Sequence, residues 1–305
     1  MSGEHGGARM AAVQIAMTLP TMLAHGRAET TTWCRAIDEG PYSSLAVPER
    51  ITYSSHSMMV ELAAAAALTE RVRLWSTVIV LPAHDAVRVA KDFASIDQLS
   101  DGRLTVGIGV GGREHDYRAI GGDFSHRWQR MDDQVATMRS IWAQEPPFDG
   151  ADPVGPPPVQ AGGPPFVAGV MGPKALARAA QWAVGVDDPT SIAAVDGDAL
   201  RARREMVEAA WQAAGRSERP HFSASLWYAL GPDAQTQLGD YIFNYMKIFD
   251  AGFARQMAES APVHSAAALR DAVAAAADAG CDEFFLVPTT ADAAELDRTR
   301  EALGI

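Results

Sequence analysis

The sequence predicts an α/β fold, a (β/α)8 TIM barrel with insertions. The chain has 305 residues, a length that suits one large barrel domain. Short apolar runs alternate with longer segments of helical periodicity, which is the pattern of βαβ units and a parallel sheet. The apolar runs number eight, as many as the strands that close such a barrel. A doubly wound open sheet is the alternative that this pattern leaves.

The expected strands are apolar and rich in β-branched residues. In chain order they are Val13–Leu19, Ser43–Pro48, Val72–Val80, Arg103–Gly109, Phe166–Val170, Ala183–Asp187, Phe222–Leu230 and Glu283–Val287. The helical segments between them include Ser57–Glu70, Ala86–Leu99, His126–Trp142, Pro173–Trp182, Leu200–Ala214 and Ala266–Ala279. Pro173 suits a first helical turn, and Gly215 and Gly280 suit the position just after a helix.

We expect residues 1–10 to form a flexible tail and residues 11–305 a single barrel domain with insertions near 145–165 and 231–262. The first insertion is rich in proline and glycine, so it is either a lid or substrate loop or a surface excursion. The second carries five aromatic residues. It is either a helix that packs on the barrel or on a second subunit, or a cap over an apolar substrate.

The charge balance disfavours polyanionic partners. Lysine and arginine total 26 against 38 acidic residues, which gives a formal net charge of −12. We therefore expect neither nucleic-acid binding nor an anionic-membrane surface. Cys34 and Cys281 are too few for a disulfide framework, and the sequence start lacks a signal-peptide pattern, so a cytoplasmic location is expected. The spacing of His, Cys, Asp and Glu predicts no metal site.

A glycine cluster ends the fourth expected strand. Gly107, Gly109 and Gly112 formally match the dinucleotide motif G-x-G-x-x-G. The match is misleading, because the motif lies in mid-chain and we expect no helix before about Ser125. Glycines at a barrel strand end either let a flat cofactor approach or allow tight packing.

A second glycine segment, GVMGPKALARAA, follows the fifth expected strand. Gly172 makes a turn and Pro173 opens a helix whose first amides are free donors. Lys174 adds positive charge. Such a turn is either an anion site for a cofactor phosphate or an ordinary βα connection.

Together these blocks resemble the bacterial luciferase-like monooxygenase family. The resemblance is carried by RVRLWSTVIVLPAHDAVRVAKDFASIDQLSDGRLTVGIGVGG at Arg71–Gly112, and it continues through Arg113–Trp142 and Pro164–Val186. A weaker block is Ala279–Pro288. The resemblance implies a TIM barrel with a flavin-type ring at its C-terminal mouth and a non-proline cis peptide near Ser76–Val78.

The resemblance also implies the cofactor. Family members use FMN with a partner reductase and O₂, or coenzyme F420, which carries carbon where FMN has N5 and moves hydrides. The second glycine segment is similar to the F420-using branch. The implied cofactor-binding residues are Ser76, Thr77, Val78, Gly109, Gly111, Gly112, Gly169, Val170, Met171, Gly172 and Lys174.

Ionisable residues near strand ends are the candidates for catalysis. Glu49 and Arg50 follow the second strand, where the family commonly has an acid–histidine pair, so Arg50 is a departure. They are either an acid/base with an oxyanion clamp or an ion pair. His84 follows the third strand and either manages a proton or caps the next helix. His115 follows the fourth strand.

The expected function is that of an F420-dependent oxidoreductase that transfers a hydride between the deazaflavin and a small organic substrate. The alternatives are a two-component monooxygenase that uses FMNH₂ and O₂, and a non-catalytic flavin-binding barrel. A flavin reductase is an expected partner only in the FMN case. The resemblance also suggests a homodimer.

Overall fold

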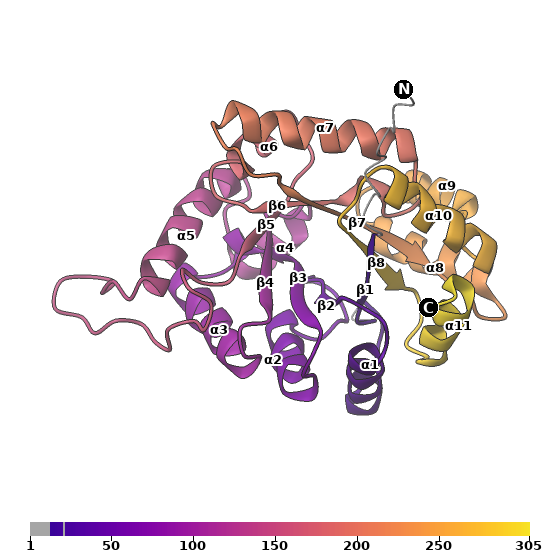
Figure 1. Ribbon diagram of the computed structural model, residues 1–305, viewed down its shortest axis with the longest axis horizontal. Coiled ribbons are helices and arrows are strands. Elements are labelled where there is room, and N and C mark those ends of the chain that lie inside the picture. Colours follow the sequence, from indigo (N-terminus) through magenta and orange to yellow (C-terminus); the bar gives the residue numbers. More distant parts are fainter. Residues whose placement is uncertain (1–12, 21) are drawn as a thin grey trace, which may run out of the picture.

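The computed structural model describes residues 13–20 and 22–305, and these form a closed barrel of eight parallel strands in the order β1 to β8 (Figure 1). Strand β8 pairs with β1, with Gln14 opposite Glu283 and Met17 opposite Leu286, which closes the sheet. The expected barrel is confirmed, and the doubly wound open sheet is excluded. The tail expected at residues 1–10 lies outside the described residues.

The elements agree closely with those expected from the sequence. The strands are β1 Gln14–Thr18, β2 Ser44–Val47, β3 Arg73–Val80, β4 Leu104–Gly109, β5 Phe166–Gly169, β6 Gly185–Asp188, β7 His221–Tyr228 and β8 Glu283–Pro288. The helices are α1 Arg27–Glu39, α2 Met58–Leu68, η1 Leu81–Ala83, α3 Ala86–Leu99, α4 Glu114–Ile120, α5 Arg127–Trp142, α6 Pro173–Ala179, η2 Pro189–Ser191, α7 Gly197–Ala213, α8 Ala234–Met246, α9 Ala251–Ser260, α10 Ala266–Asp278 and α11 Ala294–Leu303.

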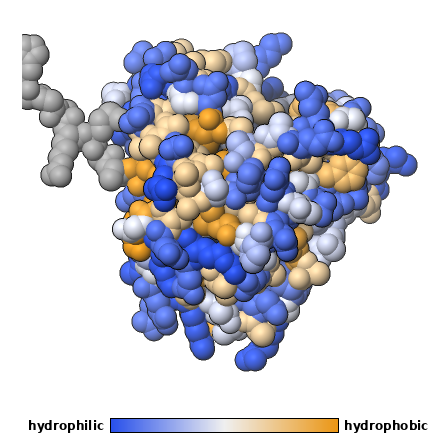
Figure 2. All heavy atoms as spheres, turned by 90° about the vertical axis from the view of Figure 1, so that its right-hand side faces the viewer, coloured by the Kyte–Doolittle hydropathy of each residue, from blue (hydrophilic) through white to orange (hydrophobic). Residues whose placement is uncertain are grey.

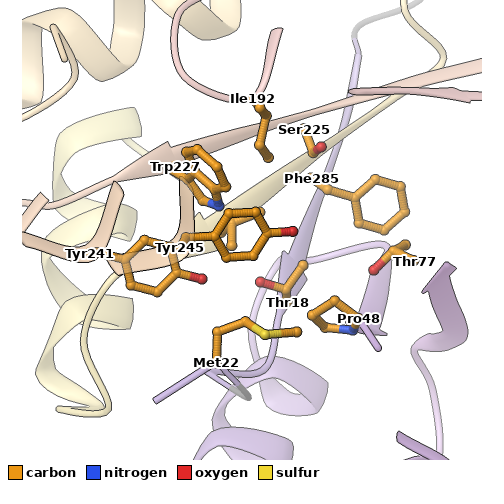
Figure 3. Close-up of a pocket in the computed structure, with 11 residues that line it drawn as sticks. Thr18, Met22, Pro48, Thr77, Ile192, Ser225, Trp227, Tyr241, Tyr245 and Phe285 are labelled. Carbon is orange, nitrogen blue, oxygen red and sulfur yellow. The ribbon is translucent and has the colours of Figure 1, made fainter. Parts of the chain in front are cut away.

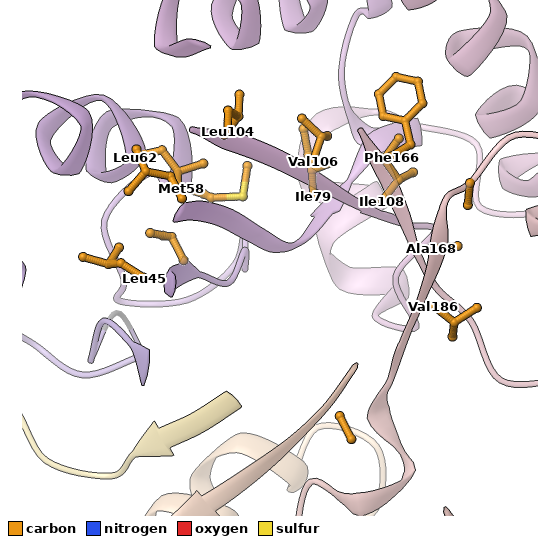
Figure 4. Close-up of a cluster of buried hydrophobic side chains, with 14 of the residues drawn as sticks. Leu45, Met58, Leu62, Ile79, Leu104, Val106, Ile108, Phe166, Ala168 and Val186 are labelled. Carbon is orange, nitrogen blue, oxygen red and sulfur yellow. The ribbon is translucent and has the colours of Figure 1, made fainter. Parts of the chain in front are cut away.

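The main core lies between the strands and the surrounding helices. Figure 4 shows part of it, where Leu45 of β2 meets Met58 and Leu62 of α2, with side chains of β4 beside them. Every residue of β2, β4 and β8 is buried, as expected for parallel strands that are covered on both faces. This packing explains why the strands appear in the sequence as nearly continuous apolar runs.

A second, smaller cluster fills the middle of the barrel itself. It consists of Ala16, Ala46, Trp75, Val167 and Phe285, which come from five different strands. The Trp75 and Phe285 rings lie 5.1 Å apart, centroid to centroid. This layer separates the two ends of the barrel.

One helix contradicts the sequence prediction. We expected no helix between the glycine cluster and about Ser125, but α4 spans Glu114–Ile120 and is followed by Gly121, which adopts the left-handed conformation with φ of 68°. Its seven residues are too few to show an apolar periodicity. The dinucleotide fold is nevertheless excluded, because the sheet is a closed barrel.

The proline-rich insertion between α5 and β5 lies on the surface and packs in part against α3. It contains no helix or strand and extends at the left of Figure 1. Its second half is bound to α3: the backbone amides of Val159 and Gln160 donate to the buried Asp97 carboxylate at 2.8 and 3.0 Å. Lys91 Nζ donates to the Gly155 carbonyl at 2.7 Å. These bonds favour a surface excursion over a lid or substrate loop for this segment.

The aromatic insertion forms α8 and α9, at the right of Figure 1. Leu238, Tyr241 and Ile242 of α8 join Trp227 and Val287, from the last residues of β7 and β8, in one apolar cluster. The insertion therefore packs on the barrel at its C-terminal mouth, which agrees both with a helix that packs on the barrel and with a cap. Figure 2 shows the same side of the molecule, where small apolar patches lie among polar side chains. None of the helices in the described ranges is both long enough and apolar enough to cross a bilayer.

Candidate active site

A pocket of about 70 Å³ lies at the C-terminal mouth of the barrel, beneath α8 (Figure 3). Its walls are mainly apolar and aromatic, with a few hydroxyl groups. The lining residues are Thr18, Met22, Pro48, Thr77, Ile192, Ser225, Trp227, Tyr241, Tyr245, Phe285 and Val287. The volume is far below the roughly 300–1,000 Å³ of typical ligand pockets, so a larger ligand requires movement of the cap.

The aromatic wall of this pocket is built by Trp227 of β7 and two tyrosines of α8. The Trp227 ring lies 4.8 Å from Tyr245 and 5.8 Å from Tyr241, centroid to centroid. Burial raises the pKa of Tyr241, so its phenol keeps its proton at neutral pH. The pocket is therefore suited to an apolar or conjugated group that is held away from water.

The floor of the mouth contains the cis peptide bond, at Thr77–Val78, within the range that the resemblance implied. The Thr77 hydroxyl lines the pocket and is buried, with no hydrogen-bond partner in residues 13–20 and 22–305. A buried hydroxyl without a partner is costly.

Glycines surround Val78. A Cβ on Gly109 would lie 2.7 Å from a Val78 methyl group, and one on Gly169 would lie 2.9 Å from the other. A Cβ on Gly107 would overlap the Ser76 carbonyl oxygen. These three glycines therefore provide tight packing within the barrel, which was one of the two explanations open at the sequence level.

One other glycine of these segments faces open space, since a Cβ on Gly172 would meet no described atom within 4 Å. A Cβ on Gly112 would contact the Phe249 ring, at 3.6 Å. Gly111 adopts a positive φ of 64° against Val80. Gly172 is thus the position where a ligand can approach the backbone, whereas approach at Gly112 requires Phe249 to move.

The segment that contains Gly172 is fixed by a residue that the sequence did not indicate. Arg203 of α7 donates to the Met171 carbonyl at 2.5 Å and to the Val170 carbonyl at 3.4 Å. Its Nε also pairs with the fully buried Asp188 carboxylate at 2.7 Å. Lys174 is exposed on α6. The turn is therefore held from behind while its outer side stays accessible.

Two of the predicted catalytic residues form a pair. Glu49 Oε1 lies 2.9 Å from His84 Nε2, and Glu49 Oε2 accepts the Val80 backbone N–H at 2.6 Å. The His84 carbonyl accepts from Gln134 at 2.7 Å, which fixes the loop. The side chain of Glu49 is 8% exposed and that of His84 is 29% exposed, so the pair is partly buried and still accessible to protons. Asp85, not His84, caps α3.

Arg50 has a different partner from its neighbour Glu49. Its Nη2 donates to the Tyr245 hydroxyl, and its guanidinium lies 4.1 Å from the Tyr245 ring centroid. Burial, together with nearby Arg113, lowers the pKa of Arg50 to about 10, so it remains charged at neutral pH. Its Nε is buried without a partner. Arg50 therefore connects the β2–α2 loop to the cap, and the hypothesis of a Glu49–Arg50 ion pair is wrong.

The structure does not bring His115 into this group. His115 is exposed on α4, and its ring makes no hydrogen bond to any residue in the described ranges. The neighbouring Asp116 is buried instead and accepts the Thr52 backbone N–H at 2.9 Å, with Arg113 at 3.7 Å. These contacts anchor α4 to the β2–α2 loop.

A second cavity, of about 500 Å³, opens at the N-terminal end of the barrel. Arg73, Trp75, His221 and Glu283 are among its lining residues. TIM-barrel enzymes place their active sites at the C-terminal end, where Glu49 and His84 lie. We therefore assign the candidate active site to the smaller pocket at the mouth.

The comparisons with known proteins agree with this architecture. The family model of the luciferase-like monooxygenases matches residues 9–305. The chain therefore belongs to the luciferase-like monooxygenase family, whose members are flavin- or F420-dependent oxidoreductases and monooxygenases, and it is an enzyme of this class.

Curated relatives match a shorter part of the chain. An uncharacterized protein of Mycobacterium tuberculosis, Rv0953c, is 38% identical over 87 residues, which are 28% of this chain and 30% of that protein. The putative coenzyme F420-dependent oxidoreductase Rv3520c of the same species is 34% identical over 85 residues, or 28% of this chain and 24% of that protein. The chain thus matches less than a third of the length of these relatives.

Solved structures match over nearly the whole chain. An F420-dependent secondary alcohol dehydrogenase in complex with an F420–acetone adduct has a TM-score of 0.77 at 18% identity, covering 96% of this chain and 99% of that one. The monooxygenase RslO1 of Streptomyces bottropensis has a TM-score of 0.72 at 19% identity, covering 96% and 97%. At such identities these likenesses show the fold alone.

Proposed function

We propose that this protein is an F420-dependent oxidoreductase that transfers a hydride between the deazaflavin and a small organic substrate. The observation that carries the proposal is the partly buried Glu49–His84 pair near the mouth of a barrel whose pocket is aromatic. The relative Rv3520c, named a putative coenzyme F420-dependent oxidoreductase, supports the choice of cofactor. The similarity of the Gly169–Lys174 segment to the F420-using branch supports it as well.

The residues present fit a deazaflavin. The Thr77 hydroxyl would donate to a polar atom of the ring, since it has no other partner among the described residues. The backbone at Gly172 leaves room for the phosphate, whereas room for the ring edge at Gly112 requires Phe249 to move. When bound, F420 supplies a hydride at the carbon that replaces N5 of a flavin, and the protein supplies orientation and water exclusion.

The proton that accompanies the hydride is managed by His84. Its Nε2 faces Glu49 Oε1 at 2.9 Å, so the carboxylate holds the imidazole ring in place. The Val80 N–H bond holds the other carboxylate oxygen of Glu49. His84 therefore donates a proton to a reduced substrate, or accepts one when a donor such as an alcohol is oxidised.

Arg50 and the cap close the site. The positive charge of Arg50 would stabilise developing negative charge on a substrate oxygen, while its bond to Tyr245 holds α8 over the pocket. Since the closed pocket measures only about 70 Å³, substrate entry requires α8 to shift away from Arg50. The same contact then re-forms to exclude water.

Replacing His84 by Ala tests this proposal. We expect turnover, measured as oxidation of reduced F420 in a screen of small carbonyl compounds, to fall at least about 100-fold, in the range of general acid–base effects. Affinity for F420, measured by fluorescence titration, should change less than about threefold, because His84 is assigned to the proton and not to the cofactor. Turnover equal to that of the unmodified protein would exclude His84 from the reaction.

A further inference from the structure

A cluster of two histidines and one glutamate lies outside the active site just described. His25 belongs to the β1–α1 connection, His56 precedes α2, and Glu61 lies in the first turn of α2. His25 Nε2 and His56 Nδ1 approach the same oxygen, Glu61 Oε1, at 2.6 and 2.9 Å. One ligand atom of each residue lies within 4.8 Å of the others. The sequence spacing predicted no metal ligands, and it missed this set because its members lie far apart in the chain.

The hydrogen-bond partners of His25 identify one of its ring nitrogens as a donor. Its Nδ1 lies 2.8 Å from the Leu23 carbonyl oxygen, which can only accept, so Nδ1 carries a hydrogen. In the neutral imidazole, Nε2 then presents a lone pair to the Glu61 carboxylate. An imidazole that donates one N–H to a carbonyl and presents the other nitrogen is the usual arrangement of a metal-binding histidine.

The Glu61 carboxylate likewise has a lone pair that meets no donor in the described part of the chain. Glu61 is 2% exposed, and its Oε2 is buried without a hydrogen-bond partner among the described residues. One negative, acceptor-only group therefore faces two imidazole nitrogens and still has an oxygen to spare. A cation placed between the three residues would satisfy the lone pairs of both rings and of the carboxylate.

We propose that His25, His56 and Glu61 form a binding site for a divalent transition-metal ion. Two imidazoles and one carboxylate are ligands of Zn²⁺ and of neighbouring transition metals, whereas Ca²⁺ and Mg²⁺ prefer oxygen alone. Ligand atoms around a tetrahedral Zn²⁺ lie about 3.4 Å apart, given bond lengths of about 2.1 Å. The cluster must therefore open by about 0.5–0.8 Å.

The burial of the three side chains decides how each can adjust. The side chains of His25 and Glu61 are 1% and 3% exposed, so the opening between these two would require a small shift within their packing. The side chain of His56 is 45% exposed, so its ring can swing outward and the ion has a route from solvent. A water molecule would complete the coordination on the exposed side.

The site would link two loops that contribute to the active-site pocket. Met22 lines the pocket from the loop that holds His25, and Pro48 lines it from the loop that holds His56. Metal binding would restrain both loops. It requires no redox cofactor, so this inference does not depend on the proposed function.

The test is a metal titration of the full chain after removal of any affinity tag and treatment with a chelator. With Zn²⁺ in competition with a chromophoric chelator, we expect one ion per chain and a Kd of about 1 μM or tighter. Co²⁺ should produce visible absorption bands of a site with nitrogen ligands. Melting temperature with and without Zn²⁺ gives a second readout, which should rise on binding.

Variants distinguish this site from other histidines. His56→Ala removes a half-exposed ligand and should weaken Zn²⁺ binding at least about tenfold without unfolding the protein. Glu61→Gln keeps the shape of a buried ligand and should weaken it too. His126→Ala is the matched control, because exposed His126 pairs with Asp123 at 2.6 Å but is not in the cluster, and binding should be unchanged. Absence of stoichiometric binding, or binding unaffected by both His56→Ala and Glu61→Gln, would overturn the proposal. The three side chains would then be held together by hydrogen bonds alone.

Discussion

The two oxygens of Glu49 serve different purposes, and two substitutions separate them. Oε2 accepts the Val80 N–H at 2.6 Å, while Oε1 faces His84 at 2.9 Å. Glu49→Gln keeps an oxygen for Val80 and removes the charge beside His84. Glu49→Ala removes both.

The expected stability follows from the Val80 bond. A partly buried N–H without an acceptor costs about 1–3 kcal/mol, and only Glu49→Ala creates one. At about 2.1 cal/mol/K of unfolding entropy per residue, 305 residues give about 0.64 kcal/mol/K, so the melting temperature of Glu49→Ala should lie about 2–5 °C below that of Glu49→Gln. Thermal unfolding followed by circular dichroism measures this difference.

The expected turnover follows from the charge. Both variants should lose about 100-fold in the rate of F420 oxidation, since neither places a carboxylate beside His84. The stable Glu49→Gln variant is the informative one, because its loss cannot be attributed to unfolding. Full turnover in Glu49→Gln, or equal melting temperatures of the two variants, would refute this assignment of the two oxygens.

Two further predictions concern the barrel interior. Burial raises the pKa of Asp187 to about 6 from an ordinary value of 3.8, although Ser223 donates to it at 3.0 Å. The folded state therefore binds this proton more tightly than the unfolded state, so the contribution of Asp187 to stability is lost as pH rises from about 4 to 6. Above pH 6, Asp187→Asn should be more stable than the unmodified protein, by at most about 3 kcal/mol. A difference in stability between the two proteins that is the same at pH 4 and at pH 8 would contradict this. Gly107→Ala should lower the free energy of unfolding, measured in urea, by about 1–3 kcal/mol, because the added Cβ would overlap the Ser76 carbonyl. Gly172→Ala should have little effect. A larger loss of stability in Gly172→Ala than in Gly107→Ala would show that the packing is wrongly described.

Most of the barrel could be predicted because parallel strands buried on both faces leave apolar runs in the sequence. The eight expected runs coincide with β1 to β8 to within a few residues at each end. Helix α4 was missed since its seven residues show no periodic apolar face. The course of the insertion at 145–165 was not predictable, because it depends on hydrogen bonds to Asp97, which lies some 60 positions earlier.

The neighbourhood of three candidate residues was predictable, but their pairing was not. Strand ends converge at the mouth of a barrel, which placed Glu49, Arg50 and His84 at one end, although the same reasoning also selected the exposed His115. The partners of each depend on side-chain directions, and these joined Glu49 to His84 and Arg50 to Tyr245. The cluster of His25, His56 and Glu61 joins residues 36 and 5 positions apart, which no ligand motif spans.

The central claim is that the cofactor is F420, and a fluorescence titration of the protein with F420 and, separately, with FMN tests it most directly. Gly172→Asp and Gly172→Asn belong in the same experiment, because both side chains fit the open turn and only Asp adds negative charge where the cofactor phosphate is expected. We expect a Kd in the micromolar range for F420, weaker binding of FMN, and a loss of at least about tenfold in F420 affinity for Gly172→Asp but not for Gly172→Asn. Tighter binding of FMN than of F420, or binding of neither, would contradict the proposed cofactor.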